Sequence, residues 1–411
     1  MRIGIDCLRA DPGYAGGLNT YILGLLEGFA AVGGGHRFQL YVTQSNRRMF
    51  ARFEGKENFE MVAVNSAGLR LRQAACRAAL VSGSPELYRK ASLRLFRKLR
   101  AAMDRGSDLI YTPTVSLLCF DHGQPTLLSM HDLQHLHYPE FFGWLRRRNR
   151  AITCGLSARL ADYFQASSQF IKQDMLGGFP EIVAAQIRVI PEGVNLEDFA
   201  PGGAGAAIPN CLGGQFLSRF LFLPAQLWPH KNHLTVLRAL ERIERKHGLR
   251  IPLVMTGARY SAAPAIFRFL AERRMDYVRY LGTVPFDQLV ALYQKAALVI
   301  APGLYESNSL PVLEAAAAGT AVIASKIPPN EELAQALELN LFEARDDAAL
   351  ARLLLRLWRD EETCRLQAIH NRRQVAGFTW KRAARSYLSW MEEIVNAGVP
   401  ARQPQAATVG A

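Results

Sequence analysis

The sequence predicts an α/β protein with two doubly wound Rossmann-like domains facing a central cleft. Three observations predict it. Short apolar runs alternate with longer segments of helical period in both halves of the chain, a pattern typical of parallel strands covered by helices on both faces. The alternation is interrupted between residues 195 and 215, where Gly, Ala and Pro dominate. At 411 residues the chain is long enough for two domains with separate cores.

The elements of the first half begin with a strand, a Gly-rich loop and a helix from about Asn19 to Ala31. Apolar runs bounded by polar turns place further strands along both halves. The predicted strands of the first half are Ile3–Leu8, Phe38–Thr43, Asp108–Thr112, Thr126–Met130, Tyr163–Ala166 and Val189–Ile190. Those of the second half are Phe220–Leu223, Leu253–Thr256, Val278–Leu281, Leu298–Ala301 and Ala321–Ala324.

The domain organisation follows from these elements. We expect an N-terminal domain over residues 1–194, a linker region over 195–215 and a C-terminal domain over 216–378. Apolar residues from Trp380 to Met391 recur at helical spacing, which predicts an amphipathic helix over 379–397 that crosses back to the N-terminal domain. Residues 398–411 are expected to be disordered.

Charge and cysteine content narrow the partners and the compartment. Lys and Arg number 49 and Asp and Glu 36, a formal net charge of +13, which implies an anionic partner: phosphorylated small molecules, anionic lipid or nucleic acid. The N-terminus does not resemble a signal peptide and no apolar run is long enough to span a bilayer. The six cysteines form no CxxC pair, so we expect reduced thiols in a cytoplasmic protein.

The most informative stretch is APGLYESNSLPVLEAAAAGTAVIAS, residues 301–325. A strand ends near Ala301, Pro311 suits the first turn of a helix and Gly319 suits its end. The intervening loop therefore lies at the carboxyl end of a strand and leads into a helix N-terminus, where unpaired backbone N–H groups bind phosphate. Glu306 lies in this loop and Glu314 in the helix, where carboxylates accept hydrogen bonds from sugar hydroxyls. Two solvated glutamates remain the alternative.

Two other loops have the same strand-to-helix position. Lys231 follows the strand Phe220–Leu223 and is expected to begin a helix, so that its ammonium meets a pyrophosphate; a solvent-exposed turn lysine is the alternative. Gly16 and Gly17 follow the first strand and allow close approach of an anion, although a structural tight turn is equally compatible with a lone Gly-Gly. The segment is not the GxGxxG fingerprint of dinucleotide-binding proteins.

A histidine-rich segment follows the strand Thr126–Met130. His131 lies at the carboxyl end of this strand, with Asp132 placed to orient it, and His135 and His137 follow in the loop. A metal site would need acidic or histidine ligands at a recognised spacing, such as H-E-x-x-H, and the sequence has none. It also has no Asp-x-Asp. We expect no metal, and loop packing for His135 and His137.

Together these motifs resemble glycosyltransferase family 4, the retaining GT-B enzymes, over roughly residues 1–397. Seven positions in and after the loop of Glu306 match the family's motif. The segment IPEGVN at 190–195 is similar to the family's Ile-Pro-Asn-Gly-Val-Asp, with Gly193 at its turn. The chain departs from the family where Ser307-Asn308-Ser309 replaces Gly-Phe-Gly and where Gln226 replaces an Arg. The matching residues are Glu306, Leu310, Pro311, Leu313, Glu314, Ala315 and Gly319.

The resemblance implies that the N-terminal domain, residues 1–194, binds the acceptor and that the C-terminal domain, residues 216–378, binds the nucleotide sugar. It also implies roles for single residues. His131 and Glu306 would be the catalytic residues and contact the reacting sugar, and Glu314 would hold the ribose. The other donor-binding residues would be Gly16, Gly17, Gln226, Lys231, Gly257, Asn308, Ser309 and Leu310. The implied reaction moves a hexose, with mannose from GDP-mannose the first choice, to a glycan or polyprenyl-linked glycan acceptor in cell-surface polysaccharide biosynthesis. It would proceed with retention and without a cofactor. The alternatives are a GT-B scaffold without activity and an NAD-linked α/β enzyme.

A basic segment lies between Arg70 and Arg105, with ten Lys or Arg, two acidic residues and interleaved leucines. Arg146, Arg147, Arg148 and Arg150 follow Trp144. A basic amphipathic helix on anionic lipid is our preferred interpretation, which would place the protein on the inner face of the cytoplasmic membrane. A solvated cationic helix is the alternative. Nucleic acid is not expected as a partner, because no nucleic-acid module accompanies the charge.

Overall fold

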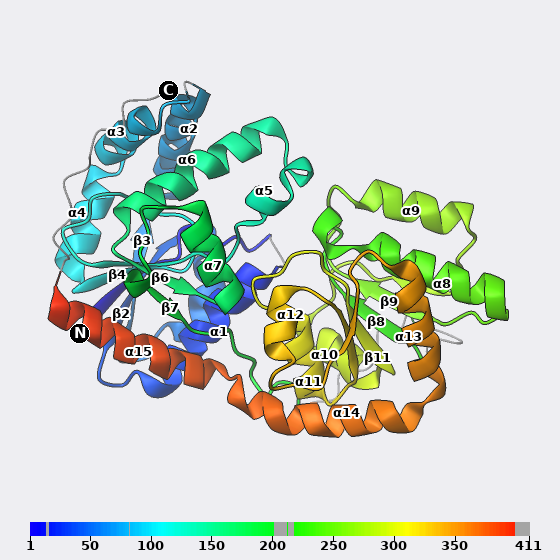
Figure 1. Cartoon of the computed structure of the whole chain (residues 1–411). Helices are drawn as coiled ribbons and strands as arrows, with labels where there is room; N and C mark the ends of the chain where they lie inside the picture. Colours follow the sequence, from blue (N-terminus) through cyan, green and yellow to red (C-terminus); the bar gives the residue numbers. More distant parts are fainter. Residues whose placement is uncertain (14–15, 82, 201–211, 213–217, 399–411) are drawn as a thin grey trace.

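The computed structural model describes residues 1–13, 16–81, 83–200, 212 and 218–398, which form two α/β domains (Figure 1). Each domain has one sheet, and every strand pairing within the two sheets is parallel. The predicted fold class of two doubly wound parallel-sheet domains is therefore confirmed.

The N-terminal sheet has the strand order β3-β2-β1-β4-β5-β6-β7. The order reverses between β1 and β4, and ligands of such sheets bind beyond the carboxyl ends of the strands at this kind of reversal. The strands are β1 (Arg2–Asp6), β2 (Arg37–Thr43), β3 (Phe59–Val64), β4 (Leu109–Thr112), β5 (Thr126–Ser129), β6 (Tyr163–Ala166) and β7 (Ile187–Val189). Their helices are α1 (Gly17–Val32), α2 (Ser66–Val81), α3 (Pro85–Leu95), α4 (Arg97–Gly106), α5 (Gln134–His137), α6 (Trp144–Leu160) and α7 (Gln169–Gly178).

The C-terminal sheet has the order β10-β9-β8-β11-β12-β13 and reverses between β8 and β11. Its strands are β8 (Leu221–Pro224), β9 (Leu253–Thr256), β10 (Val278–Tyr280), β11 (Leu298–Ala301), β12 (Val322–Ser325) and β13 (Asn340–Phe342). The helices that follow β8 are α8 (His233–His247), α9 (Ala263–Glu272), α10 (Phe286–Lys295), α11 (Leu310–Ala318), α12 (Pro328–Leu333), α13 (Asp347–Arg359), α14 (Glu361–Gln374) and α15 (Trp380–Ala397).

Two strands were not among those predicted, β3 and β13. Both are edge strands, and an edge strand need not be apolar on both faces, so its sequence lacks the continuous apolar run that identifies a central strand. In β3 only the first residue is buried. β13 is three residues long. Strand β1 ends two residues earlier than predicted, and β7 ends one residue earlier.

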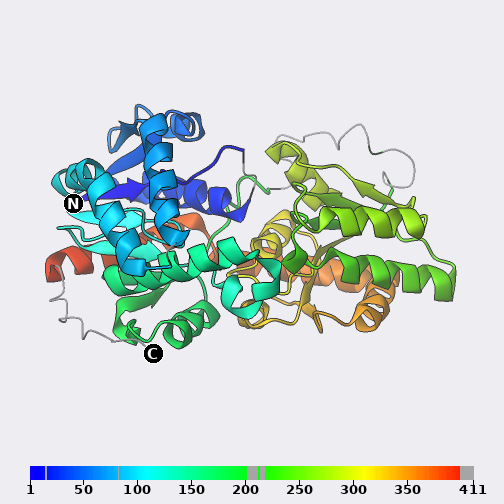
Figure 2. The ribbon, with the colours of Figure 1, turned by 90° about the horizontal axis from the view of Figure 1, so that it is seen from above.

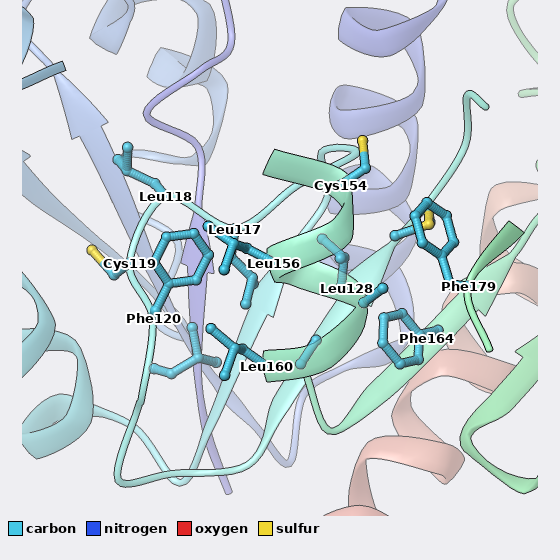
Figure 3. Close-up of a cluster of buried hydrophobic side chains, with 14 of the residues drawn as sticks. Leu117, Leu118, Cys119, Phe120, Leu128, Cys154, Leu156, Leu160, Phe164 and Phe179 are labelled. Atoms are coloured by element: carbon cyan, nitrogen blue, oxygen red, sulfur yellow. The ribbon is translucent and has the colours of Figure 1, made fainter. Parts of the chain in front are cut away.

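Apolar side chains cover both faces of each sheet. In β4, Leu109 and Tyr111 belong to one buried cluster and Ile110 to another, because successive side chains of a strand point to opposite faces. Figure 3 shows the cluster between the sheet and α6, where Leu156 and Leu160 meet Leu128 and Phe164. Strand β11 alternates in the same way. Burial on both faces explains the continuous apolar runs from which these strands were predicted.

Helix α15 returns to the N-terminal domain, as Figure 1 shows. Thr379 caps the helix by accepting a hydrogen bond from the Arg382 N–H at 3.2 Å. Trp380 packs on Gly24 and Gly28 of α1, positions at which an added Cβ would overlap it. The Tyr387 hydroxyl joins that of Tyr21 at 2.5 Å. The glycines of α1 thus let a helix from the far end of the chain complete the N-terminal core.

Direct contacts join the two domains, which lie side by side in Figure 2. The Glu332 carboxylate accepts hydrogen bonds from the backbone N–H groups of Gln169 (2.8 Å) and Phe170 (2.7 Å), at the N-terminus of α7. The Tyr305 hydroxyl accepts one from the Leu133 N–H (3.1 Å), and the Ser167 hydroxyl donates to the Ser307 carbonyl (3.1 Å). The loop that contains Glu306 is therefore held against the N-terminal domain.

Candidate functional site

The centre of the site is an ion pair between Lys231 and Glu306. The Lys231 ammonium donates to both Glu306 carboxylate oxygens, at 2.7 and 2.8 Å. About a fifth of the lysine side chain is exposed, and 15% of that of the glutamate. Glu306 lies in the loop after β11 and Lys231 in the loop after β8, the two strands between which the sheet order reverses. The pair therefore lies where such a sheet binds its ligands.

Lys231 does not begin a helix, contrary to the prediction. It ends a 3₁₀ turn over Pro229–Lys231, and Asn232 adopts a left-handed conformation, with φ of 56°, before α8 begins at His233. The Asn232 side chain donates to the Pro302 carbonyl at 3.0 Å. Asn tolerates this backbone region, and the turn directs Lys231 toward the loop after β11 rather than along α8.

The start of α11 has the predicted form. Pro311 lies in its first turn, and Gly319, with φ of 73°, ends it. Asn308 and Ser309 are buried, and the Ser309 hydroxyl donates to the Asn330 side chain. The Asn308 side-chain nitrogen is buried and has no hydrogen-bond partner among the described residues. A buried amide donor without a partner is costly, so this atom is suited to a bound oxygen.

Gly17 and Leu310 meet across the domains. A Cβ added to Gly17 would lie 3.8 Å from the Leu310 side chain, and Leu310 is part of the N-terminal core cluster. Gly16 is the N-cap of α1 in extended conformation. The two loops predicted to bind phosphate therefore come together, although they belong to different domains.

Glu314 lies one turn into α11, half-buried, and its carboxylate accepts a hydrogen bond from the Tyr293 hydroxyl at 2.6 Å. Burial raises the pKa of Glu314 to about 7, while the Tyr293 hydrogen bond acts in the opposite direction. A free carboxylate oxygen or an acid proton at this position can bind a ligand hydroxyl.

His131 lies at the carboxyl end of β5 and packs edge-on against Tyr21, with ring centroids 4.1 Å apart. Burial lowers the pKa of His131 to about 4, so the imidazole is neutral at pH 7. Asp132 does not orient it, contrary to the prediction: its carboxylate pairs with Arg150 at 3.1 Å. Both ring nitrogens of His131 are buried and lack a hydrogen-bond partner among the described residues, so the ring has two unsatisfied polar atoms.

Glu192 is the residue of this cluster that sequence reasoning missed. It lies in the IPEGVN segment and is 5% exposed. One carboxylate oxygen is 3.9 Å from Nδ1 of His131. The pKa of Glu192 is raised to about 8, mainly by burial and then by the negative charge of Glu306. The available signal was its departure from the family's Asn at this position.

Two stacked rings lie close in sequence to Gln226 and Gly257, two of the residues expected to bind the donor. Trp228 and Tyr260 lie 3.9 Å apart at an interplanar angle of 11°. The Trp228 indole donates to the Gln226 side-chain oxygen at 3.0 Å, while the buried Gln226 nitrogen has no partner in the described part of the chain. Gly257 has φ of 122°, and a Cβ there would overlap the Ala225 carbonyl. The backbone at Gly257 therefore requires glycine.

Two further features concern the acceptor side and metals. A cavity of about 500 Å³ lies beside the carboxyl ends of β1 and β2 and is lined by Arg9, Arg70 and Arg77 together with Tyr88 and Phe96.

Among the residues that the structure describes, no three His, Cys, Asp or Glu side chains are grouped to hold a metal ion. His137 is paired with Asp174 at 2.7 Å. No described helix is long and apolar enough to cross a membrane.

Comparison with known proteins supports the resemblance over both domains. The model of Glycosyltransferase Family 4 matches residues 15–198, and that of Glycosyl transferases group 1 matches residues 218–374. A D-inositol 3-phosphate glycosyltransferase of Corynebacterium diphtheriae is 29% identical over 48% of this chain and 48% of its own length. O-antigen chain mannosyltransferase B of Escherichia coli is 31% identical over 37% of this chain and 40% of its own length. The matched part thus spans about half the length of these relatives or less.

Solved structures resemble the whole chain. HepE of Anabaena, in a crystal with UDP and glucose, has a TM-score of 0.72 at 16% identity, covering 96% of this chain and all of its own. Sucrose-phosphate synthase of Thermosynechococcus elongatus has a TM-score of 0.72 at 19% identity, covering 97% and 100%. At these identities the likeness concerns the fold.

Proposed function

The chain belongs to glycosyltransferase family 4 and has the GT-B fold, and from this premise we propose that it transfers a hexose from a nucleotide sugar to a glycan or polyprenyl-linked glycan. The observation that carries the proposal is the meeting of Lys231, the N-terminus of α11 and the Gly16-Gly17 loop between the two domains. One cation and two sets of backbone amides there suit a diphosphate.

The diphosphate is the leaving group of the reaction, and its departure requires compensation of negative charge. Lys231 supplies that charge, and the backbone N–H groups at 308–310 and at 16–17 supply dipoles. Gln226 donates a hydrogen bond through its unpartnered nitrogen where the family has a cation. To reach the phosphate, Lys231 exchanges at least one of its two contacts with Glu306.

Retention at the anomeric carbon is consistent with the charges around the sugar position. His131 is neutral at pH 7 and Glu306 is engaged with Lys231, so neither is set up as a free nucleophile or a charged base. The leaving phosphate oxygen accepts the proton of the acceptor hydroxyl on the same face of the sugar. His131 and Glu306 position the sugar, and the reaction needs no metal.

The donor choice rests on the relatives. The E. coli relative and one of Salmonella typhimurium, 23% identical over 53% of this chain, are named O-antigen chain mannosyltransferases, which supports mannose from GDP-mannose as the first donor to test. The complexes of HepE contain UDP, which makes UDP-hexoses the second group.

The acceptor side includes a surface suited to a membrane. Helices α2, α3 and α6 contact one another and lie together at one end of the N-terminal domain (Figure 1). Large exposed apolar side chains emerge from them beside the basic residues of 70–105 and 146–148, and the arginine-lined cavity opens among the same helices. These side chains are Leu71, Val81, Leu87, Trp144 and Leu145. This arrangement supports a cytoplasmic, peripheral enzyme that takes a lipid-linked, anionic acceptor for surface polysaccharide or lipopolysaccharide.

A donor screen tests the proposal. The purified protein is incubated with GDP-mannose, UDP-glucose and other nucleotide sugars, and release of the nucleoside diphosphate is measured by mass spectrometry, with and without polyprenyl-linked acceptor. We expect turnover with one donor class. No hydrolysis or transfer with any donor would favour the scaffold alternative, to which the absence of the usual Arg at Gln226 points.

A further inference from the structure

Glu192 is a buried carboxyl in the middle of the site that no assigned role uses. In the N-terminal domain its side chain faces His131, which lies at the end of β5. In the C-terminal domain the charged groups that act on it are Lys231, Glu306 and Glu314. A hydrogen bond from the Ser307 side chain, in the loop after β11, lowers the pKa of Glu192. Glu192 therefore contacts both domains at the place where a donor sugar would lie.

Among the described residues, the cation that acts on Glu192 is Lys231, and it is already paired. The Lys231 ammonium is held by both oxygens of Glu306, and Arg150 is paired with Asp132. His131 is uncharged at pH 7, since its pKa is about 4, and the pKa of the neighbouring His230 is lowered to about 3 by burial. An isolated buried carboxylate is costly, so such a group keeps its proton. The pKa of about 8 agrees with this geometry.

The backbone of Glu192 is fixed by its neighbours. A Cβ at Gly193 would overlap the backbone of Thr379 and Trp380, and the Val194 N–H donates to the Phe378 carbonyl at 3.0 Å. The start of α15 thus holds the segment in place. Glu192 and its partner Ser307 are also two positions at which this chain departs from the family pattern, with Glu for Asn and Ser for Gly, and the two departures contact each other.

We propose that Glu192 is a donor-positioning residue that works as an uncharged carboxylic acid, donating its proton in a hydrogen bond to the donor diphosphate or its sugar. This inference rests on the proposed function, because it needs a nucleoside diphosphate beside Lys231. With Glu192 protonated, the charges of Lys231 and Glu306 balance, and Glu314 is the other carboxyl facing Glu192 that titrates near neutral pH. With Glu192 ionised, the site is already negative before the diphosphate arrives, and the hydrogen-bond donor is lost.

The test is the affinity for UDP, GDP, ADP, CDP and dTDP between pH 6.5 and 9, measured by calorimetry on the wild type and on Glu192→Gln. Gln has the shape of the protonated acid but does not titrate in this range. The ratio of the wild-type Kd to that of Glu192→Gln should rise about tenfold over this range, because one pKa unit corresponds to a tenfold change. Titration of the nucleotide phosphate and of Glu314 affects both proteins and cancels in the ratio.

A second variant gives an independent readout. Ser307→Ala removes the hydrogen bond that stabilises the carboxylate form of Glu192, so the pH at which affinity falls should move upward. The exposed Glu57→Gln is the matched control, and its profile should follow the wild type. If Glu192→Gln does not fold, the Ser307→Ala profile decides, and an unmoved midpoint overturns the proposal.

The outcomes separate this inference from the proposed function. If a nucleoside diphosphate binds and the Kd ratio stays within about twofold across the pH range, Glu192 does not act through its proton and the inference is overturned, while the proposed function stands. If no nucleoside diphosphate binds either protein at any pH, the proposed function fails and the inference fails with it.

Discussion

Lys231 and Glu306 are 75 positions apart in the sequence, and the lysine ammonium contacts both carboxylate oxygens of the glutamate. From the sequence, Lys231 was expected to bind the diphosphate and Glu306 to contact the sugar. Their pairing means that each controls the charge of the other. A donor diphosphate therefore competes with Glu306 for Lys231, and changes at either residue should affect donor binding in opposite directions.

Lys231→Ala should weaken binding of nucleoside diphosphates, because it removes the cation and leaves Glu306 as an unpaired anion in the site. Loss of one charge-assisted hydrogen bond corresponds to about 1.5–3 kcal/mol, or roughly a 10- to 150-fold weaker Kd. Calorimetry with UDP and GDP measures it, with the exposed Lys56→Ala as control. Unchanged affinity would show that another group binds the phosphate.

Glu306→Gln should have the opposite effect on diphosphate binding. Removing the carboxylate charge frees Lys231, so nucleoside diphosphate affinity should rise, whereas kcat should fall by about 10²-fold or more if the side chain positions the sugar in the transition state. The thermal midpoint should change little, because the side chain lies in a loop and its replacement opens no cavity. Equal turnover in the variant and the wild type would refute the catalytic role.

Chelation should leave activity intact. In the described part of the chain no three metal-ligating side chains converge, and in the proposed mechanism Lys231 provides the charge that a divalent ion would supply to the diphosphate. The measurement is turnover after exhaustive treatment with EDTA, compared with turnover after Mg²⁺ or Mn²⁺ is added back. Activity that falls with the chelator and returns with either ion contradicts a metal-independent mechanism.

The protein should bind anionic vesicles reversibly. Each basic residue near an anionic surface contributes about 1 kcal/mol before screening, and Leu71 (73% exposed) and Trp144 (66% exposed) can insert. Sedimentation should show binding to anionic liposomes at low salt, no binding to neutral ones, and release at high salt. Leu71→Ser with Trp144→Ser should weaken binding about tenfold or more, while Phe286→Ser, an exposed aromatic of the other domain, should not. Indifference to anionic vesicles at low salt would point to a soluble acceptor.

Glu314→Gln should change how stability depends on pH. Since the folded-state pKa of Glu314 is about 7, above its ordinary value of 4.5, the folded protein holds a proton that the unfolded chain releases between these values. Wild-type stability therefore falls as pH rises from about 4.5 to 7, by up to about 1.4 kcal/mol per unit. Chemical unfolding of both proteins at pH 5 and pH 7 should show that the variant loses less stability over this interval. Parallel losses would mean that Glu314 is not buried as described.

The sequence by itself determined the elements whose signals are local. The strands on either side of the site were predicted because burial on both faces imposes continuous apolar runs, and the ends of α11 because Pro311 and Gly319 satisfy backbone requirements within a few residues. The loop positions of Glu306 and His131 follow from the same signals. The prediction that Lys231 begins a helix was wrong, because no residue type in this segment marks the 3₁₀ turn over Pro229–Lys231 that precedes α8.

The tertiary structure alone decided which side chains meet. The pairing of Lys231 with Glu306, of Arg150 with Asp132 and of Ser307 with Glu192 depends on how sheet edges and domains face one another. Burial follows the same rule: Phe96 and Leu99 of the basic segment belong to the core, whereas Leu71 and Leu87 are exposed. Periodicity and capping act over a few residues, but the charge state of Glu192 depends on groups more than a hundred positions away, and only the folded chain brings them within reach of one another.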